Sequence, residues 1–318
     1  MKNIIICFDG TGNSPDKFHT NIYKLFKAIK IDDHQIVQLP FYVEGVGNST
    51  FKPFRLLSQA LGLGVGRKVK DAYKQICKTY SDGDKIFIFC FSRGAFEATV
   101  LADLISQVGI LDRNKIKYDY DLERLIKRTY FELRLKSKAF LNKLIAKPYF
   151  KFQKIKLQEY LRDETSRVEF LGLFDCVDST GLFAGLPLSD VINNKVFCYK
   201  LKSEFPHANI KCIKHAISLS EERASFAPYL YNESIHPNIE SRLYIGEHSN
   251  IGGGLSRDGL SAIPLQWLMN ESEKLSLVFE DNAKESINDD INRFDNVFNS
   301  RSGLKIFFRQ RARNFSKL

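Results

Sequence analysis

The stretch Lys85-Ile-Phe-Ile-Phe-Cys-Phe-Ser-Arg-Gly-Ala95 decides the fold that this chain is expected to adopt. It begins with a strongly apolar run over residues 85–91 and leads straight into an apolar helical pattern that reaches about residue 108. A strand that turns at Ser-x-Gly into a helix is typical of the nucleophile elbow, which strains the serine backbone and projects its hydroxyl above a parallel sheet. Ser92 is therefore the candidate nucleophile. Gly94 is expected because a side chain there would strike the strand.

The elbow departs from its usual pattern, Gly-x-Ser-x-Gly, at one position. Cys90 stands in place of the first glycine, and we expect this small residue to be tolerated. Ser-x-Gly alone is a weak pattern, but its position between an apolar strand and an apolar helix strengthens it. The alternative interpretation is a structural serine that caps the N-terminus of the helix.

The rest of the chain repeats this alternation of strands and helices. It favours an α/β fold of the α/β-hydrolase type, with a mostly parallel sheet and helices on both faces. We find no internal repeat and no linker, so residues 1–318 are expected to form a single domain. The predicted strands are 4–8, 35–43, 85–91, 168–174 and 242–245, and the predicted helices are 20–30, 58–80, 95–108 and 260–273.

A serine nucleophile needs a base to remove its proton and a carboxylate to orient that base. Of the six histidines, His248 follows the last predicted strand in a glycine-rich loop, where this fold places its base. His215 lies in an apolar stretch and is expected to be a core residue. Asp175 directly follows the strand 168–174, as a triad carboxylate should, and Asp178 is the alternative. The chain order of nucleophile, acid and base is that of the α/β-hydrolases.

Acyl transfer also requires an oxyanion hole made of two preorganised N–H donors. The N–H of Arg93, which follows the nucleophile, is expected to be one donor. Gly10 or Thr11, in the loop after the first strand, is expected to supply the other. The stretch Asp9-Gly-Thr also resembles the start of the haloacid-dehalogenase phosphatases, but Cys7 stands where those enzymes carry their nucleophilic aspartate. We therefore disfavour that alternative.

Positive charge is concentrated in two segments of this chain, whose net charge is +10. Residues 113–167 contain 16 basic and 7 acidic residues, and residues 301–318 contain 6 basic and no acidic ones. Apolar residues at helical spacing predict that 113–165 form a basic lid over the strand ends; an extra helix pair packed on the sheet is the alternative. Residues 281–318 are expected to form a basic C-terminal extension. Such charge favours contact with an anionic membrane, or else it is a solvated helical face.

Composition excludes several classes of protein. Hydrophobic residues make up 44% and charged residues 26% of the chain, as in globular proteins. No apolar run approaches the ~18 residues that span a bilayer, and the N-terminal apolar run is too short for a signal peptide. The cysteines stand singly, which argues against a zinc ribbon or a disulfide scaffold. We expect a cytoplasmic protein, or one exported without a cleaved signal peptide.

Six motifs occur in an order that is specific to one family. Together they resemble the α/β-hydrolase domain family that includes the phospholipase effectors of the type VI secretion system, and the resemblance covers about residues 1–275. The motifs are Phe8-Asp-Gly-Thr-Gly-Asn13, Thr20-Asn21, Cys90-Phe-Ser-Arg-Gly-Ala95, Phe170-Leu-Gly-Leu-Phe-Asp175, His215-Ala-Ile-Ser-Leu-Ser-Glu-Glu-Arg223 and His248-Ser-Asn-Ile-Gly-Gly-Gly254.

The resemblance implies a triad of Ser92, Asp175 and His248, the same residues that position along the chain selects. It also implies hydrolysis of a carboxylic ester. The basic, aromatic-rich insertion favours a phospholipid or other anionic acyl ester as the substrate, and the mechanism of such a triad requires no metal or other cofactor. The alternatives are an esterase acting on a non-lipid ester and a non-catalytic module that binds anionic membrane or nucleic acid. We expect no nucleic-acid partner, and the sequence does not indicate an oligomeric state.

Overall fold

A single six-stranded sheet forms the centre of the molecule. The computed structural model describes residues 1–10, 18–31, 34–45, 65–136, 156–162, 167–177, 210–228, 230, 233, 237–300, 310–313 and 315. The strands in these ranges follow the order β2-β1-β3-β4-β5-β6, and every neighbouring pair is parallel. They are β1 (Lys2–Phe8), β2 (Val37–Val43), β3 (Lys85–Phe91), β4 (Val168–Phe174), β5 (Ile213–Ser218) and β6 (Ile239–Tyr244). The predicted α/β fold with a mostly parallel sheet is confirmed.

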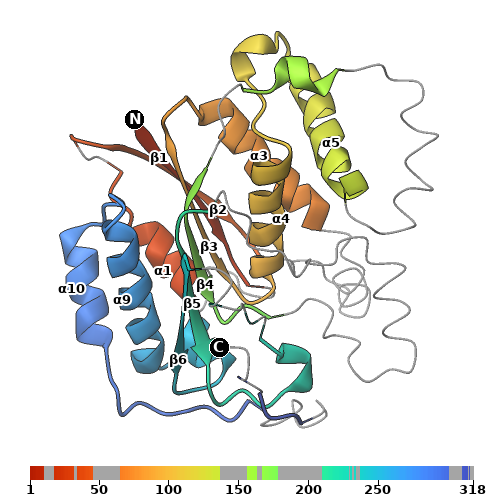
Figure 1. Cartoon of the computed structure of the whole chain (residues 1–318). Helices are drawn as coiled ribbons and strands as arrows, with labels where there is room; N and C mark the ends of the chain where they lie inside the picture. The colour runs from red at the N-terminus through yellow and green to blue at the C-terminus, as the bar shows by residue number, and fades with distance from the viewer. Residues whose placement is uncertain are drawn as a thin grey trace.

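Helices cover both faces of the sheet, as the alternation in the sequence predicts. α3, α4 and α5 lie on one side, and α1, α9 and α10 lie on the other (Figure 1). Within the described ranges, every helix is too short or too polar to cross a lipid bilayer. The helices are α1 (Asn21–Ala28), α3 (Val65–Thr79), α4 (Gly94–Gln107), α5 (Asp119–Lys136), α8 (His248–Gly252), α9 (Gly259–Glu273) and α10 (Asp281–Asp290), with short 3-10 turns η1 (Arg113–Lys115), η2 (Leu157–Tyr160) and η4 (Ala224–Phe226).

Two hydrophobic clusters, one on each face, arise because successive side chains of a strand point to opposite faces. In β1, Ile4 and Ile6 join the cluster beneath α3 and α4, whereas Ile5 and Cys7 join the cluster beneath α1 and α9. β3 repeats this division, with its isoleucines on the first face and its phenylalanines on the second. A strand buried on both faces has no polar side to show. The sequence therefore marks β1 and β3 as continuous apolar runs.

The strand order reverses beside β1, which lies between β2 and β3. At such a switch point, the loops at the carboxyl ends of neighbouring strands leave the sheet in different directions and open a crevice that binds ligands. The carboxyl ends of β1 and β3 carry the loop after Phe8 and the turn at Ser92. The predicted nucleophile therefore lies where this architecture forms its binding sites.

Three elements differ from the sequence-based expectation. β5 is not predicted as a strand, because Lys214 and His215 interrupt its apolar run. Residues 248–252 form the short helix α8 rather than an irregular loop. In the predicted basic extension, residues 281–300 begin with α10 and contain 2 basic and 5 acidic residues. The basic character of the extension therefore belongs to residues 301–318.

The described part of the predicted lid lies along α3, on one face of the sheet (Figure 1). Lys78, near the end of α3, pairs with Asp119 at the start of α5 (3.2 Å). Tyr130, further along α5, packs against Gly66 at the start of α3. α5 is thus antiparallel to α3, with Tyr130 beside the start of that helix. Residues 137–155 and 163–165 lie outside the described residues, and a lid over the strand ends remains a prediction.

Candidate active site

Ser92 occupies the sharp turn between β3 and α4. Its φ of 57° lies in the left-handed region, where a side chain is strained. Its N–H donates to the carbonyl oxygen of Phe174 (3.1 Å), which fixes the turn against β4. Gly94 begins α4, and a Cβ at this position would lie 2.8 Å from the carbonyl oxygen of Phe8. The helix can therefore begin this close to the end of β1 only with glycine, which is the physical reason for the Ser-x-Gly pattern.

Three side chains from three separate segments meet at the carboxyl edge of the sheet. Ser92 follows β3, Asp175 follows β4, and His248 comes after β6. His248 Nε2 lies 2.7 Å from Ser92 Oγ, and His248 Nδ1 lies 2.6 Å from Asp175 Oδ2. All three residues are buried. The structure thus brings together the residues predicted as nucleophile, base and acid, while the alternative acid, Asp178, lies outside the described residues.

The Asp175 carboxylate determines which nitrogen of His248 carries the proton. An ionised carboxylate only accepts hydrogen bonds, so Nδ1 of the neutral imidazole must be the donor. Nε2 then has a lone pair, which accepts the hydrogen bond of the Ser92 hydroxyl. This tautomer is the one that can take a proton from the serine.

Asp175 makes more ionic and hydrogen-bonding contacts than the sequence predicts. Its backbone φ is 39°, again in the left-handed region. Its Oδ1 accepts from the N–H of Ser218 (2.8 Å) and from Arg313 Nη1 (2.6 Å), and its Oδ2 accepts from Arg313 Nη2 (2.8 Å). Burial opposes ionisation, but the charge and the hydrogen bonds of Arg313, with those of His248, outweigh it. They hold the pKa of Asp175 well below its usual range.

The imidazole of His248 is fixed between two aromatic rings. The ring centroid of Phe91 lies 4.7 Å away in a tilted arrangement, and that of Phe226 lies 4.9 Å away edge-on. His248 is the first residue of α8, whose N-terminus is closed by a capping box that begins at Glu247. Gly252 leaves room for the Phe91 ring, since a Cβ there would lie 2.0 Å from it. One glycine of the segment after His248 therefore has a packing role.

A buried ion cluster supports the backbone beside His248. Arg223 donates to Glu221 through Nε and Nη2, each at 2.8 Å, and its Nη2 lies 3.3 Å from Glu247. Glu221 also accepts from the backbone N–H of His248 (3.3 Å). Burial acts against the charge of Glu221, but the hydrogen bonds and the charge of Arg223 lower its pKa to about 2. The cluster links the segment after β5 to the start of α8.

His215 is a buried core residue, as the sequence predicts. Its Nε2 accepts a hydrogen bond from the N–H of Cys176 (3.0 Å), the residue after Asp175. Burial lowers the pKa of His215 to about 3, so the ring is neutral near pH 7. This histidine therefore holds the backbone beside the acid.

The predicted oxyanion donors are described only in part. Arg93 caps the N-terminus of α4, so its N–H lies directly after the nucleophile and at the positive end of a helix dipole. The N–H of Gly10 donates to the carboxylate of Asp9 (2.6 Å). Because this N–H is already engaged, the structure argues against Gly10 as the second donor. Thr11 lies outside the described residues and stays a prediction.

A family comparison agrees with the order of motifs along the chain. The sequence model of the family described as "T6SS, Phospholipase effector Tle1-like, catalytic domain" matches residues 2–271. This chain belongs to that family.

Relatives of the chain are longer than the chain itself. It is 29% identical over 243 residues to the uncharacterized protein YEL023C of Saccharomyces cerevisiae, a match that covers 71% of this chain and 32% of that protein. An uncharacterized protein from Pseudomonas aeruginosa has a similar structure (17% identity, TM-score 0.47, 92% of this chain and 48% of that chain). The Tle1 effector bound to the VgrG spike from the Type 6 secretion system also has a similar structure. It is 17% identical, with a TM-score of 0.47, and the match covers 80% of this chain and 51% of that chain. The chain spans about a third of the curated relative and about half of each structure.

Several residues around the site are not found by sequence reasoning. Arg313 lies beyond the range that matches the Tle1-like family, in a segment notable only for its basic residues. Glu221 and Arg223 belong to a quoted motif of the family resemblance, but the motif alone does not indicate what they contact. Their partners are distant in sequence. Only the fold shows that they surround Asp175 and His248.

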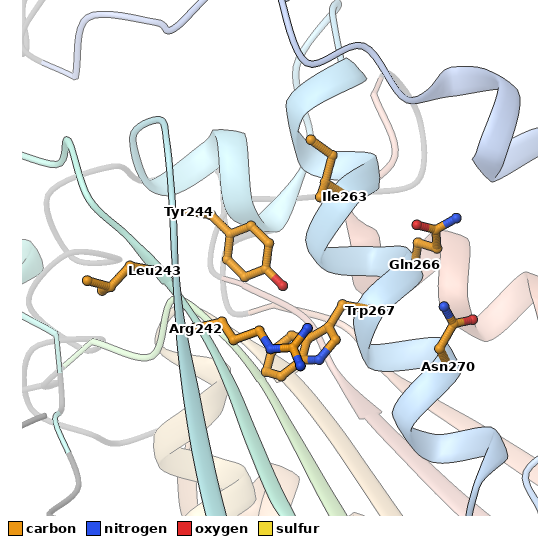
Figure 2. A pocket seen from close by; sticks show the side chains of 7 residues that line it. All are labelled: Arg242, Leu243, Tyr244, Ile263, Gln266, Trp267 and Asn270. Carbon is orange, nitrogen blue, oxygen red and sulfur yellow. The ribbon is translucent and has the colours of Figure 1, made fainter.

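A separate hollow of about 440 Å³ is lined by residues of β6 and α9 (Figure 2). Arg242 stacks over the ring of Trp267, with the guanidinium carbon 4.6 Å from the ring centroid, and Tyr244 lies beside them. Neither Ser92 nor His248 lines this hollow. Among the described residues, no group of three or more His, Cys, Asp or Glu side chains is placed to hold a metal ion.

Proposed function

We propose that this chain is a serine hydrolase that cleaves a carboxylic ester of a lipid. In this proposal Ser92 is the nucleophile, His248 the general base and acid, and Asp175 the carboxylate that orients the imidazole. One observation carries the proposal. The hydroxyl, the imidazole and the carboxylate form a continuous hydrogen-bonded chain with contacts of 2.7 and 2.6 Å, which is the arrangement that activates a serine.

In the first half of the reaction, His248 Nε2 takes the hydroxyl proton as Ser92 Oγ attacks the ester carbonyl carbon. The carbonyl oxygen becomes an oxyanion, which the N–H of Arg93 and a donor of the loop after β1, Thr11 in our proposal, stabilise. His248 then returns the proton to the leaving alcohol as the ester bond breaks. The product of this half is an acyl group bound to Ser92.

In the second half, His248 removes a proton from water, and the resulting hydroxide attacks the acyl carbon. Collapse of the second oxyanion breaks the bond to Ser92 Oγ, which regains a proton from His248. The carboxylic acid leaves and the site returns to its starting state. Asp175 stays ionised throughout and stabilises the imidazolium that forms twice in each turnover.

A phospholipid acyl ester is the substrate class that we favour. Family membership supports a lipid ester as the substrate. The basic segment 113–167 supports an anionic surface as the place where the enzyme meets that substrate. In its described part, Lys115, Lys117 and Lys127 are exposed. Near an anionic bilayer each basic residue adds about 1 kcal/mol of attraction.

A panel of p-nitrophenyl esters and phospholipid vesicles, tested on wild type and on Ser92→Ala, tests the proposal. We expect the variant to keep its fold and to lose at least about 10³-fold in kcat, because the nucleophile is gone. Ser81→Ala, which removes an exposed hydroxyl, should keep wild-type kcat. A folded Ser92→Ala protein with wild-type turnover would refute the mechanism. Cleavage of short p-nitrophenyl esters without phospholipid cleavage would instead favour a non-lipid ester.

A further inference from the structure

The guanidinium of Arg313 forms a two-pronged contact with the carboxylate of Asp175. Nη1 donates to Oδ1 (2.6 Å) and Nη2 donates to Oδ2 (2.8 Å), although the two residues are 138 positions apart. The Arg313 side chain is 3% exposed and that of Asp175 is 0% exposed. This is a buried, bidentate ion pair on the same carboxylate that accepts from His248.

Arg313 is itself held in place by the backbone around the site. Nη1 also donates to the carbonyl oxygen of Ser218, and Nη2 donates to that of Phe226, each at 2.8 Å. These carbonyls belong to the last residue of β5 and to the last residue of η4. The guanidinium therefore ties two backbone segments to the carboxylate that lies between them.

The chain that carries Arg313 pairs with the segment after β5. Gln310 forms an isolated antiparallel bridge with Arg223, and the N–H of Arg311 donates to the carbonyl oxygen of Glu222 (2.9 Å). The side chain of Gln310 also reaches the Glu222 carboxylate (3.1 Å). Residues 310–313 thus lie against the same stretch that supports His248, which fixes where the Arg313 side chain can reach.

We infer that Arg313 is a positioning residue for the acid of the triad, an inference that rests on the proposed function. The two Nη groups of the planar guanidinium form a fork that binds both carboxylate oxygens. Such a fork fixes the rotation of the carboxylate as well as its position. The Ser218 N–H on Oδ1 alone leaves that rotation open. With the fork in place, Oδ2 is held 2.6 Å from His248 Nδ1, and the imidazole is held toward Ser92.

The fork also explains how an ionised carboxylate is kept in a fully buried position. A buried charge requires a partner and hydrogen bonds for its remaining lone pairs. Arg313 supplies both, and it does so from a segment outside the residues 2–271 that match the family. The acid therefore depends on a part of the chain beyond the matched catalytic domain.

Variants of Arg313 in the full chain test this inference, with Arg311→Ala as the matched control because the Arg311 side chain is exposed. Arg313→Ala should lower kcat about 10²-fold, the loss expected from a misplaced catalytic group, with KM changed less than about threefold. The same variant should react about 10²-fold more slowly with a fluorophosphonate, whose attack by Ser92 needs no knowledge of the natural substrate. Arg311→Ala should keep the wild-type value of both rates. Millimolar methylguanidinium should restore part of both rates in Arg313→Ala and leave those of Arg311→Ala unchanged.

Arg313→Lys separates the fork from its charge. Lysine keeps the positive charge but cannot bind both oxygens in one plane, so we expect kcat about tenfold below wild type. Circular dichroism checks that each variant is folded. Wild-type kcat in folded Arg313→Ala or Arg313→Lys overturns the inference, and so does failure of both variants to fold, since Arg313 would then be only structural. A wild-type protein that neither cleaves esters nor labels at Ser92 overturns the proposed function instead.

Discussion

The nucleophile and the acid of this site are held in place by different means. Ser92 is positioned by its own neighbourhood, because β3, the turn and α4 are continuous in sequence and Gly94 allows α4 to begin against β1. Asp175 also follows directly from its strand, yet its carboxylate is held by Ser218 and by Arg313. One half of the site is built from local backbone geometry, and the other from side-chain contacts between distant segments.

This difference separates what a short motif can encode from what it cannot. A left-handed serine with glycine two residues later, between an apolar strand and an apolar helix, is a local pattern that one continuous stretch of sequence encodes. A buried carboxylate instead needs positive charge and donors, and these can come from any segment that the fold brings near. The position of Ser92 should therefore be sensitive to changes of backbone and packing, and the position of the Asp175 carboxylate to changes of charge.

Asp175→Asn should have the largest effect on kcat, because it removes the charge of the carboxylate that orients His248. The amide would donate toward His248 Nδ1, so the proton would move to Nε2 and the imidazole could no longer accept the proton of Ser92. We expect kcat to fall about 10⁴-fold. Steady-state kinetics on a p-nitrophenyl ester measures this, with the exposed Asp289→Asn as control. Turnover within tenfold of wild type would mean that Asp175 is not the acid.

Glu221→Gln should weaken the buried ion cluster of Glu221, Arg223 and Glu247 beside His248. The folded pKa of Glu221 is lowered from 4.5 to about 2, so its contribution to stability is present above pH 4.5 and is lost as the pH falls toward 2. At pH 7 the variant should lose about 3 kcal/mol in free energy of unfolding. Denaturant unfolding of both proteins at pH 7 and near pH 2.5 tests this. A deficit of equal size at both pH values would contradict the expected sign.

Glu97, near Ser92 in sequence, should give the free energy of unfolding the opposite pH dependence, and Glu97→Gln should remove it. Glu97 lies in the first turn of α4, and burial raises its pKa from 4.5 to about 7, against the charges of Lys68 and Arg93. The folded state binds more protons between these values, so the free energy of unfolding of wild type should fall by about 3 kcal/mol as the pH rises from 4.5 to 7. The variant should lack this decline. Parallel stability curves for the two proteins would rule out a buried titrating Glu97.

Gly94→Ala should have the smallest effect on stability and acts purely through packing. The added Cβ would lie 2.8 Å from the carbonyl oxygen of Phe8 and 3.0 Å from that of Asp9, and these backbone atoms can yield only if α4 shifts. We expect a loss of about 1–3 kcal/mol in free energy of unfolding and a lower kcat, since Arg93 would move with the helix. Thermal unfolding and kinetics check both. An unchanged protein would show that the elbow tolerates a side chain.

The sequence predicts the framework well, because buried parallel strands are continuous apolar runs. Residues 85–91 and 168–174 are the observed bounds of β3 and β4, and the strand–turn–helix at Ser92 follows from them. β5 is missed because Lys214, with its ammonium near Glu240 and Glu271, breaks the apolar pattern of a strand. The first half of the predicted lid lies along α3, since an amphipathic pattern indicates burial but not the surface that it meets.

The site is predicted in its three central residues and missed in its surroundings. Ser92, Asp175 and His248 each follow a strand, so position along the chain brings them to one edge of the sheet. Arg313 has no such signal, because its partner is set by where residues 310–313 pair with the segment after β5. From the sequence alone, a basic residue near the end of a basic segment is expected to be exposed to solvent.

Identification of the residue modified by a fluorophosphonate probe tests the central claim most directly. The wild-type protein is incubated with the probe, digested and analysed by mass spectrometry, with His248→Ala treated in parallel. We predict a single phosphonylated peptide that carries the adduct on Ser92, and labelling at least about 10³-fold slower without the imidazole. An unlabelled, folded wild-type protein, or an adduct on another residue while Ser92 stays free, would contradict the account.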